Sequence, residues 1–255
     1  MSQIFLENTL YLCGTSSESN EEFSSSFLYS INALKEPLSI SLEVNTCHPH
    51  YYPSLTILRN EYLIVIGGLN SKKCELYSIT NKKWKELPEL PEERYGASAI
   101  CDNISNRVYL IGGYNHSSKK CCMTVLKLNV NKSVKWDTIL NIHNAEILAR
   151  MNTSIVKIDD GRLLILGGED GEGKRKDDIV EINLKEKVFH PKKIESKFAK
   201  PPKFLTMRFA LSGSNEELFA MDDNEEEDMN IVHKIEKDFP TILYIDDKKI
   251  KDKIK

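Results

Sequence analysis

The sequence has no apolar run that approaches the roughly 20 residues needed to cross a bilayer, which argues against a membrane-spanning helix. Its first residues, MSQIFLENTLYLCG, contain neither a basic segment nor a long apolar segment, so we expect no signal peptide and a cytoplasmic protein. Neither sign of charge is in large excess, because the sequence has 35 Lys and Arg and 38 Asp and Glu. The resulting net charge of −3 gives no field that would recruit nucleic acid or an anionic membrane, and we expect neither as a partner.

Residue patterns that carry catalysis or hold metals are also missing. The six cysteines include no C-x-x-C pair, and the adjacent Cys121 and Cys122 cannot surround a tetrahedral metal alone. His48 and His50 form the only close histidine pair, with a proline between them; a loop that links two repeats is the preferred interpretation over a chelate. No G-x-S-x-G, P-loop or dinucleotide-binding fingerprint is found. We therefore expect no catalytic residues, no metal and no cofactor.

A strand pattern that ends in two glycines is present three times. Glycine packs nothing and adds backbone entropy, so its recurrence at strand ends needs a structural reason. Two degraded copies can be aligned as well, one ending at Gly14 and one at Asp222. The copies are about 50 residues apart, a period that indicates a repeat architecture. The three clear pairs are Gly67-Gly68, Gly112-Gly113 and Gly167-Gly168.

Each copy contains more than the strand that ends in glycines. An apolar or alternating run precedes that strand, and two further runs follow it after a polar loop. In the second copy the four runs are YPSLTILR, EYLIVIGG, CELYSIT and WKELPEL. Four short strands in about 50 residues, with almost no helical periodicity, indicate one blade of a β-propeller. We expect five four-stranded blades at residues 1–49, 50–93, 94–149, 150–202 and 203–249, followed by a basic tail at 250–255.

The motif resembles the kelch repeat. In the second copy Gly67-Gly68 is followed by Tyr77 and, after six more residues, by Trp84. The third copy departs from this pattern, because Leu126 replaces the tyrosine and Trp136 comes late. The resemblance implies an all-β, kelch-type propeller in which the glycine pairs, Tyr77 and Trp84 are structural. The glycines would end the second strand where blades crowd together, and the two aromatic side chains would pack against a neighbouring blade.

Closure of the propeller has two interpretations. The run TILYIDD near the end of the chain could supply the fourth strand of blade five, with blade one built from N-terminal residues only. Alternatively, TILYIDD could complete blade one. The sequence does not decide between them.

Six residues near the start of the first strands are the candidates for partner binding. Arg94 and Arg150 precede the first strands of their copies, and His50 takes the same place. In kelch propellers that recruit peptides, residues at these positions line the mouth of the central channel. A rim of two arginines and a histidine favours an acidic or phosphorylated peptide. The alternative is that the arginines bond their own blade-linking turns. The other three candidates follow four residues later: Ser54, Ser98 and Ser154.

From the resemblance and the absence of catalytic patterns, we expect a non-catalytic scaffold for protein–protein interaction. One alternative is a structural subunit of a large assembly, for instance a cytoskeletal one. A second is an enzyme that acts on a small sugar-like molecule in the axial channel, since some kelch-like propellers are copper oxidases or sugar-processing enzymes.

Overall fold

The structure is a computed structural model, and the chain divides into two compact units, residues 1–141 and 142–255. The structure describes residues 2–15, 25–32, 34, 37, 39–139, 145–159, 161–176, 178–186, 188–192, 195–196, 210–212, 218–224, 229–235 and 241–245.

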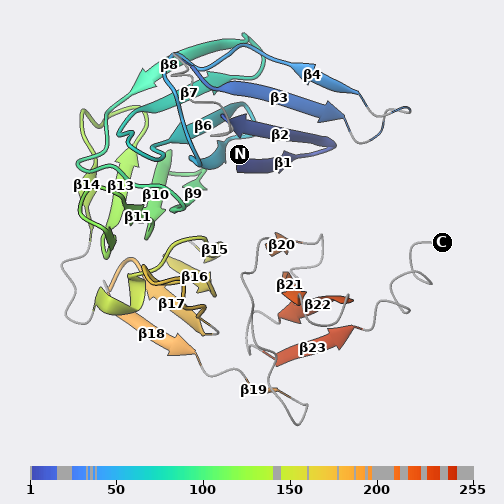
Figure 1. Ribbon diagram of the computed structural model, residues 1–255, viewed down its shortest axis with the longest axis vertical. Helices are drawn as coiled ribbons and strands as arrows, with labels where there is room; N and C mark the ends of the chain where they lie inside the picture. Colours follow the sequence, from blue (N-terminus) through green and yellow to red (C-terminus); the bar gives the residue numbers. More distant parts are fainter. Residues whose placement is uncertain are drawn as a thin grey trace. The chain divides into compact units, whose positions relative to one another are not determined.

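The first unit contains three antiparallel four-stranded sheets, in each of which the strands pair in the order of the sequence (Figure 1). A short hairpin, β11 (Tyr114–Asn115) with β12 (Lys120–Cys121), extends the loop after β10. The first sheet is β1 (Ser2–Leu6), β2 (Thr9–Gly14), β3 (Phe27–Asn32) and β4 (Ile40–Leu42). The second is β5 (Ser54–Leu58), β6 (Tyr62–Ile66), β7 (Cys74–Ser78) and β8 (Lys83–Leu87). The third is β9 (Ser98–Asp102), β10 (Arg107–Ile111), β13 (Val125–Asn129) and β14 (Asp137–Thr138).

The second unit repeats this arrangement and adds a wider sheet. A short 3-10 helix, η1 (Ala145–Leu148), precedes its first strand. One sheet has four strands: β15 (Ser154–Asp159), β16 (Arg162–Leu166), β17 (Ile179–Asn183) and β18 (Val188–Lys192). The other has five: β19 (Glu195–Ser196), β20 (Ala210–Ser212), β21 (Leu218–Asn224), β22 (Met229–Ile235) and β23 (Thr241–Ile245).

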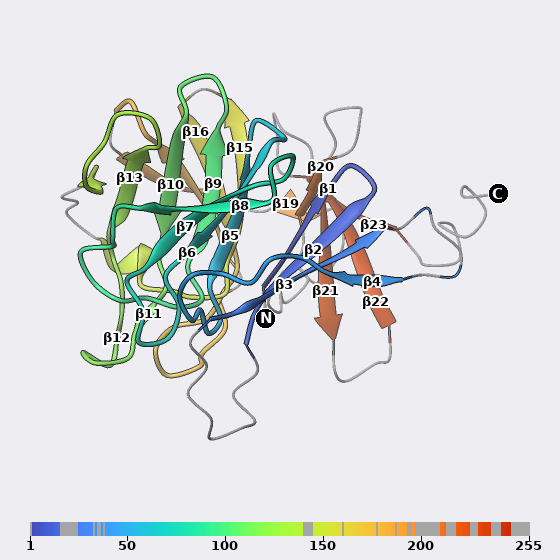
Figure 2. The same cartoon turned by 90° about the horizontal axis from the view of Figure 1, so that it is seen from above.

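How deeply a strand is buried depends on whether neighbouring strands and sheets cover it. The second strand β6 is a continuous apolar run, YLIVI, because neighbours cover both of its faces. The outer strand β8, KWKEL, has three exposed residues, and two of them are lysines that protect its open edge. The first strands β1, β5 and β9 contact one another in sequence, and Figure 2 shows β5 beside β9. In the first unit, therefore, the first strands form the inner edge where consecutive sheets meet.

The predicted all-β propeller architecture is confirmed. Four of the five expected blades are four-stranded sheets. The fifth, predicted at 203–249, lies partly outside the described residues; of it the structure describes β20 to β23, which pair in a sheet with β19. Strand β23, the TILYI run, pairs with β22, and β1 to β4 all come from N-terminal residues. This pairing agrees with the first closure interpretation, in which TILYIDD supplies the fourth strand of blade five.

The glycine pairs stand where a side chain has no room. At Gly67, φ is 61° and an added Cβ would lie 2.8 Å from the carbonyl oxygen of Arg94. At Gly68, φ is 130° and a Cβ would lie 2.7 Å from the carbonyl oxygen of Tyr51. Positive φ also holds for the other two pairs. The strand ends in glycine because the backbone turns through a left-handed conformation directly against the segment that links two blades.

The aromatic pair of the second blade reaches the first. The rings of Tyr77 and Trp84 lie 4.9 Å apart and belong to a cluster with buried side chains of β2 and β3. The Tyr77 hydroxyl donates to Glu43 at 3.2 Å, and Trp84 Nε1 donates to the Val44 carbonyl at 2.8 Å. In the third blade Trp136 comes later in the sequence, yet its Nε1 donates to the Pro88 carbonyl at 2.9 Å, again just after the preceding blade's outer strand. The tryptophan of the third blade therefore contacts the preceding blade although its spacing from the glycine pair differs.

Candidate functional site

The three predicted cationic residues share one structural role. His50 Nδ1 lies 2.7 Å from the carbonyl oxygen of Gly67, which is the first glycine of its own blade's pair. Arg94 Nη1 donates to the Gly112 carbonyl at 3.2 Å, and Arg150 Nη1 donates to the Gly167 carbonyl at 3.0 Å. Each side chain therefore ties the segment that enters a blade to the end of that blade's second strand.

Both guanidinium groups are held by acidic and polar groups of the loops around them. Arg94 Nη2 lies 2.6 Å from Glu92 and 2.9 Å from the Thr124 hydroxyl. Arg150 forms a two-pronged ion pair with Asp178, at 2.6 and 3.0 Å, and its Nε donates to the Ile147 carbonyl at 2.8 Å. A bidentate pair of this kind fixes the guanidinium plane as well as its position.

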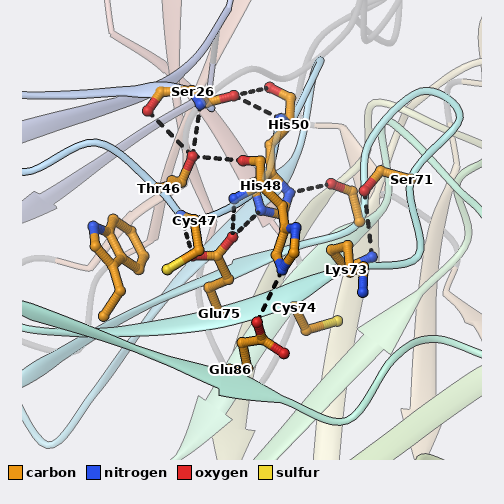
Figure 3. Close-up of polar contacts among 12 residues, drawn as sticks. Ser26, Thr46, Cys47, His48, His50, Ser71, Lys73, Cys74, Glu75 and Glu86 are labelled. Carbon is orange, nitrogen blue, oxygen red and sulfur yellow. Dashed lines mark hydrogen bonds and ion pairs between the residues drawn. The ribbon is translucent and has the colours of Figure 1, made fainter. Parts of the chain in front are cut away.

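The histidine sits in a wider polar cluster, shown in Figure 3. His50 Nε2 lies 3.1 Å from Glu75 Oε1, and both side chains are fully buried. The Glu75 carboxylate also accepts the backbone N–H of Cys47 at 2.8 Å and that of His48 at 2.9 Å. The Ser26 hydroxyl accepts the His50 backbone N–H at 2.6 Å. One carboxylate thus holds the backbone of the segment that links blade one to blade two.

The electrostatics of this cluster favour an ionised Glu75. Burial alone would raise the pKa of Glu75, but the hydrogen bonds from the His50 ring and from the amides of Cys47 and His48 outweigh it, and the pKa is lowered. The buried thiol of Cys13 shifts in the other direction. Burial, with the nearby negative charge of Glu75, raises the pKa of Cys13 to about 12.

Burial limits what these residues can contact. The exposed fractions are 0% for His50, 1% for Arg94 and 2% for Arg150. Each side chain also lies beside an acidic residue: Glu75, Glu92 and Asp178 respectively. This is the arrangement that the structural alternative describes, in which cationic side chains bond their own blade-linking turns. Direct partner binding by these three side chains stays a prediction, and the structure gives it no accessible surface.

The predicted serines lie at the start of the inner strands. Ser54, Ser98 and Ser154 are the first residues of β5, β9 and β15, and all three are buried. The Ser54 hydroxyl donates at 2.6 Å to the carbonyl of Ala97, the residue just before the next blade's serine. Ser2, the first residue of β1, makes the corresponding bond to the Pro53 carbonyl. The Ser2 and Ser54 hydroxyls therefore link neighbouring inner strands, a role that the sequence analysis did not assign.

A second feature of the linking segments was also missed. Two residues after each cationic position the backbone is left-handed: φ is 52° at Tyr52, 62° at Gly96 and 55° at Asn152. Glycine and asparagine adopt this conformation readily, whereas a tyrosine does so only with strain. Alignment of YYP with YGA and MNT carries the signal, since Gly96 and Asn152 occupy the positions that correspond to Tyr52.

Neither a metal-binding cluster nor a membrane-spanning helix is found in the described part of the chain. No group of three or more His, Cys, Asp or Glu side chains there could hold a metal ion. No helix among the same residues is both long and apolar enough to cross a membrane.

Comparisons with known proteins agree with the geometry. No protein-family model matches the chain. A kelch repeat-containing protein of Dictyostelium discoideum is 29% identical over 87 residues, which cover 32% of this chain and 13% of that protein's length. The solved structure of YjhT matches with a TM-score of 0.60 and 13% identity, over 86% of this chain and 70% of the other. The glycine-ended strands, the four-stranded sheets and these two likenesses together support a kelch-repeat β-propeller.

Proposed function

We propose that the protein is a non-catalytic scaffold, and that it binds a protein or peptide partner through the surface of the segments that link its blades. The kelch-repeat fold supports a role in protein interaction. The observation that carries the choice of surface is Tyr52, a large aromatic side chain that is 47% exposed and held in a left-handed backbone conformation.

The backbone at Tyr52 has a conformational penalty that its surroundings must offset. A left-handed residue with a side chain is less favourable by about 1–2 kcal/mol, and Pro53 further restricts the residue before it. Strain of this kind gathers at functional sites, where the side chain is kept for a purpose other than stability. Tyrosine is also one of the residues that most often dominate binding energy at protein interfaces.

The linking segment around Tyr52 is firmly held. The Leu69 amide donates to the Tyr51 carbonyl at 2.7 Å, and Glu75 holds the amides of Cys47 and His48. A surface that is fixed before binding loses less conformational entropy when a partner arrives. The buried His50 ring supports this segment through its contacts with Gly67 and Glu75. Because Arg94 and Arg150 are paired with Glu92 and Asp178, the proposal includes no preference for an acidic partner.

The experiment compares Tyr52→Gly with the wild-type chain. Glycine removes the aromatic side chain and the backbone strain together, so melting temperature should stay unchanged or rise. Proteins captured from native cell extract are quantified by mass spectrometry, and one captured by wild type should be lost with Tyr52→Gly. Ile104→Ser, at another site 77% exposed, is the matched control and should retain it. A partner retained equally by all three proteins would show that binding lies elsewhere.

A further inference from the structure

Blade two places a histidine where blades three and four place arginines. His50, Arg94 and Arg150 occupy the same position and bond the same carbonyl, that of the first glycine in the pair. An arginine is permanently charged, whereas a histidine changes its charge near physiological pH. A histidine at this position therefore differs from an arginine in its response to pH as well as in its shape.

Both ring nitrogens of His50 face hydrogen-bond acceptors. Nδ1 is 2.7 Å from the carbonyl oxygen of Gly67, which can only accept. Nε2 is 3.1 Å from Glu75 Oε1, and that oxygen also accepts the amide of His48. A neutral imidazole has one N–H and could satisfy only one of these contacts as donor; an imidazolium satisfies both.

We propose that His50 is a buried imidazolium which, with Glu75, forms a pH-sensitive lock on the segment Cys47–Tyr52. The lock acts through the backbone, because Glu75 binds the amides of Cys47 and His48, and the His50 ring binds the turn at Gly67. The inference rests on this geometry alone and stands whether or not the segment binds a partner.

Loss of the proton would release the segment. A ring nitrogen without hydrogen would then face an oxygen lone pair, and the Glu75 carboxylate would remain buried without a positive partner. Breaking a buried ion pair in this way is strongly destabilising. The linking segment would relieve the conflict by moving, which would also move Tyr52. Blades three and four would keep their bonds at the same pH, since arginine does not titrate there.

The thiols and the lysine around the pair do not change charge near neutral pH. Burial raises the pKa of Cys13 on β2 and of Cys74 on β7 to about 12, so neither thiol ionises near neutral pH. The pKa of Cys47 is raised too, by its partial burial and by Glu75. Lys73, whose side chain pairs with Glu89, stays charged because that hydrogen bond raises its pKa. The remaining pair, His48 with Glu86, lies nearer the surface, with side chains 28% and 66% exposed.

The first test is nitrogen-15 NMR of the wild-type histidine side chains at pH 7. We expect protonated shifts at both His50 ring nitrogens, with assignment by loss of the signals in His50→Gln. A single unprotonated nitrogen would overturn the proposal, because Glu75 would then hold the proton. The protonation state is read from the folded wild-type protein, and the variant serves only to assign the signals.

The second test compares melting temperatures at pH 6 and pH 9 for wild type and His50→Arg. Wild type should lose about 5 °C or more on going to pH 9 relative to His50→Arg, whose cation does not titrate. His116→Gln, at an exposed histidine, is the control and should follow wild type. Identical pH dependence in wild type and a folded His50→Arg would refute the lock.

Discussion

Replacing Arg94 by alanine should destabilise the fold, because this side chain is 1% exposed and supports two turns of blade three. The guanidinium donates to the carbonyls of Gly112 and Thr124, at 3.2 and 3.4 Å, and to the Thr124 hydroxyl at 2.9 Å. Each buried acceptor left without a donor costs about 1–3 kcal/mol, and the cavity adds to this. Glu92 is 41% exposed and can return to water, so its loss of a partner adds little.

The expected total is about 3–5 kcal/mol, the range for losing one member of a buried charged network. For a protein of this size that corresponds to a fall in melting temperature of roughly 6–20 °C. The assay is thermal and urea unfolding, with Arg107→Ala as the control, because Arg107 is an exposed residue of β10. The control should stay within about 0.5 kcal/mol of wild type. Equal stability of the two alanine variants would refute the structural role of Arg94.

Three further substitutions test other parts of the fold. Gly68→Ala should cost about 1–3 kcal/mol in unfolding experiments, since its Cβ would meet a backbone carbonyl at 2.7 Å; Gly173→Ala, also left-handed but with nothing within 4 Å, should cost less. Trp136→Phe should cost about 1 kcal/mol by loss of the bond to the Pro88 carbonyl, measured by urea unfolding. The Glu75 carboxylate should stabilise the fold fully above its ordinary pKa of 4.5, with the gain lost as pH falls through the lowered native pKa; an acid titration of stability with the same slope in Glu75→Gln would contradict this.

The sequence allowed the architecture to be predicted because the repeat carries it in local patterns. Each glycine pair follows an apolar run that forms a central strand, and the runs on either side pair with it in order. A chain that repeats this unit at a nearly constant period has few alternatives to a stack of similar sheets. Trp136 shows the limit of spacing rules, since it comes late in the sequence and still reaches the preceding blade.

The roles of the cationic residues could not be predicted from position alone. Alignment placed Arg94 and Arg150 at corresponding sites before their inner strands, but it gave no direction for a long side chain. In the structure each side chain turns back beneath its own loop, because a bent glycine turn leaves a carbonyl that needs a donor. The acidic residue that pairs with an arginine, such as Asp178 with Arg150, is the signal that could have indicated where the arginine side chain points. That pairing brings together residues far apart in the sequence.

The serine bonds between inner strands contrast with the irregular outer strands, and the contrast bears on protein engineering. Ser2 and Ser54 tie neighbouring sheets together at the inner edge, while the outer strand varies from five residues in β8 to two in β14. The longer connection before β14 already accommodates extra residues without loss of the Trp136 contact. The exposed turn at Asn131–Lys132 is therefore the place to insert a label or affinity tag.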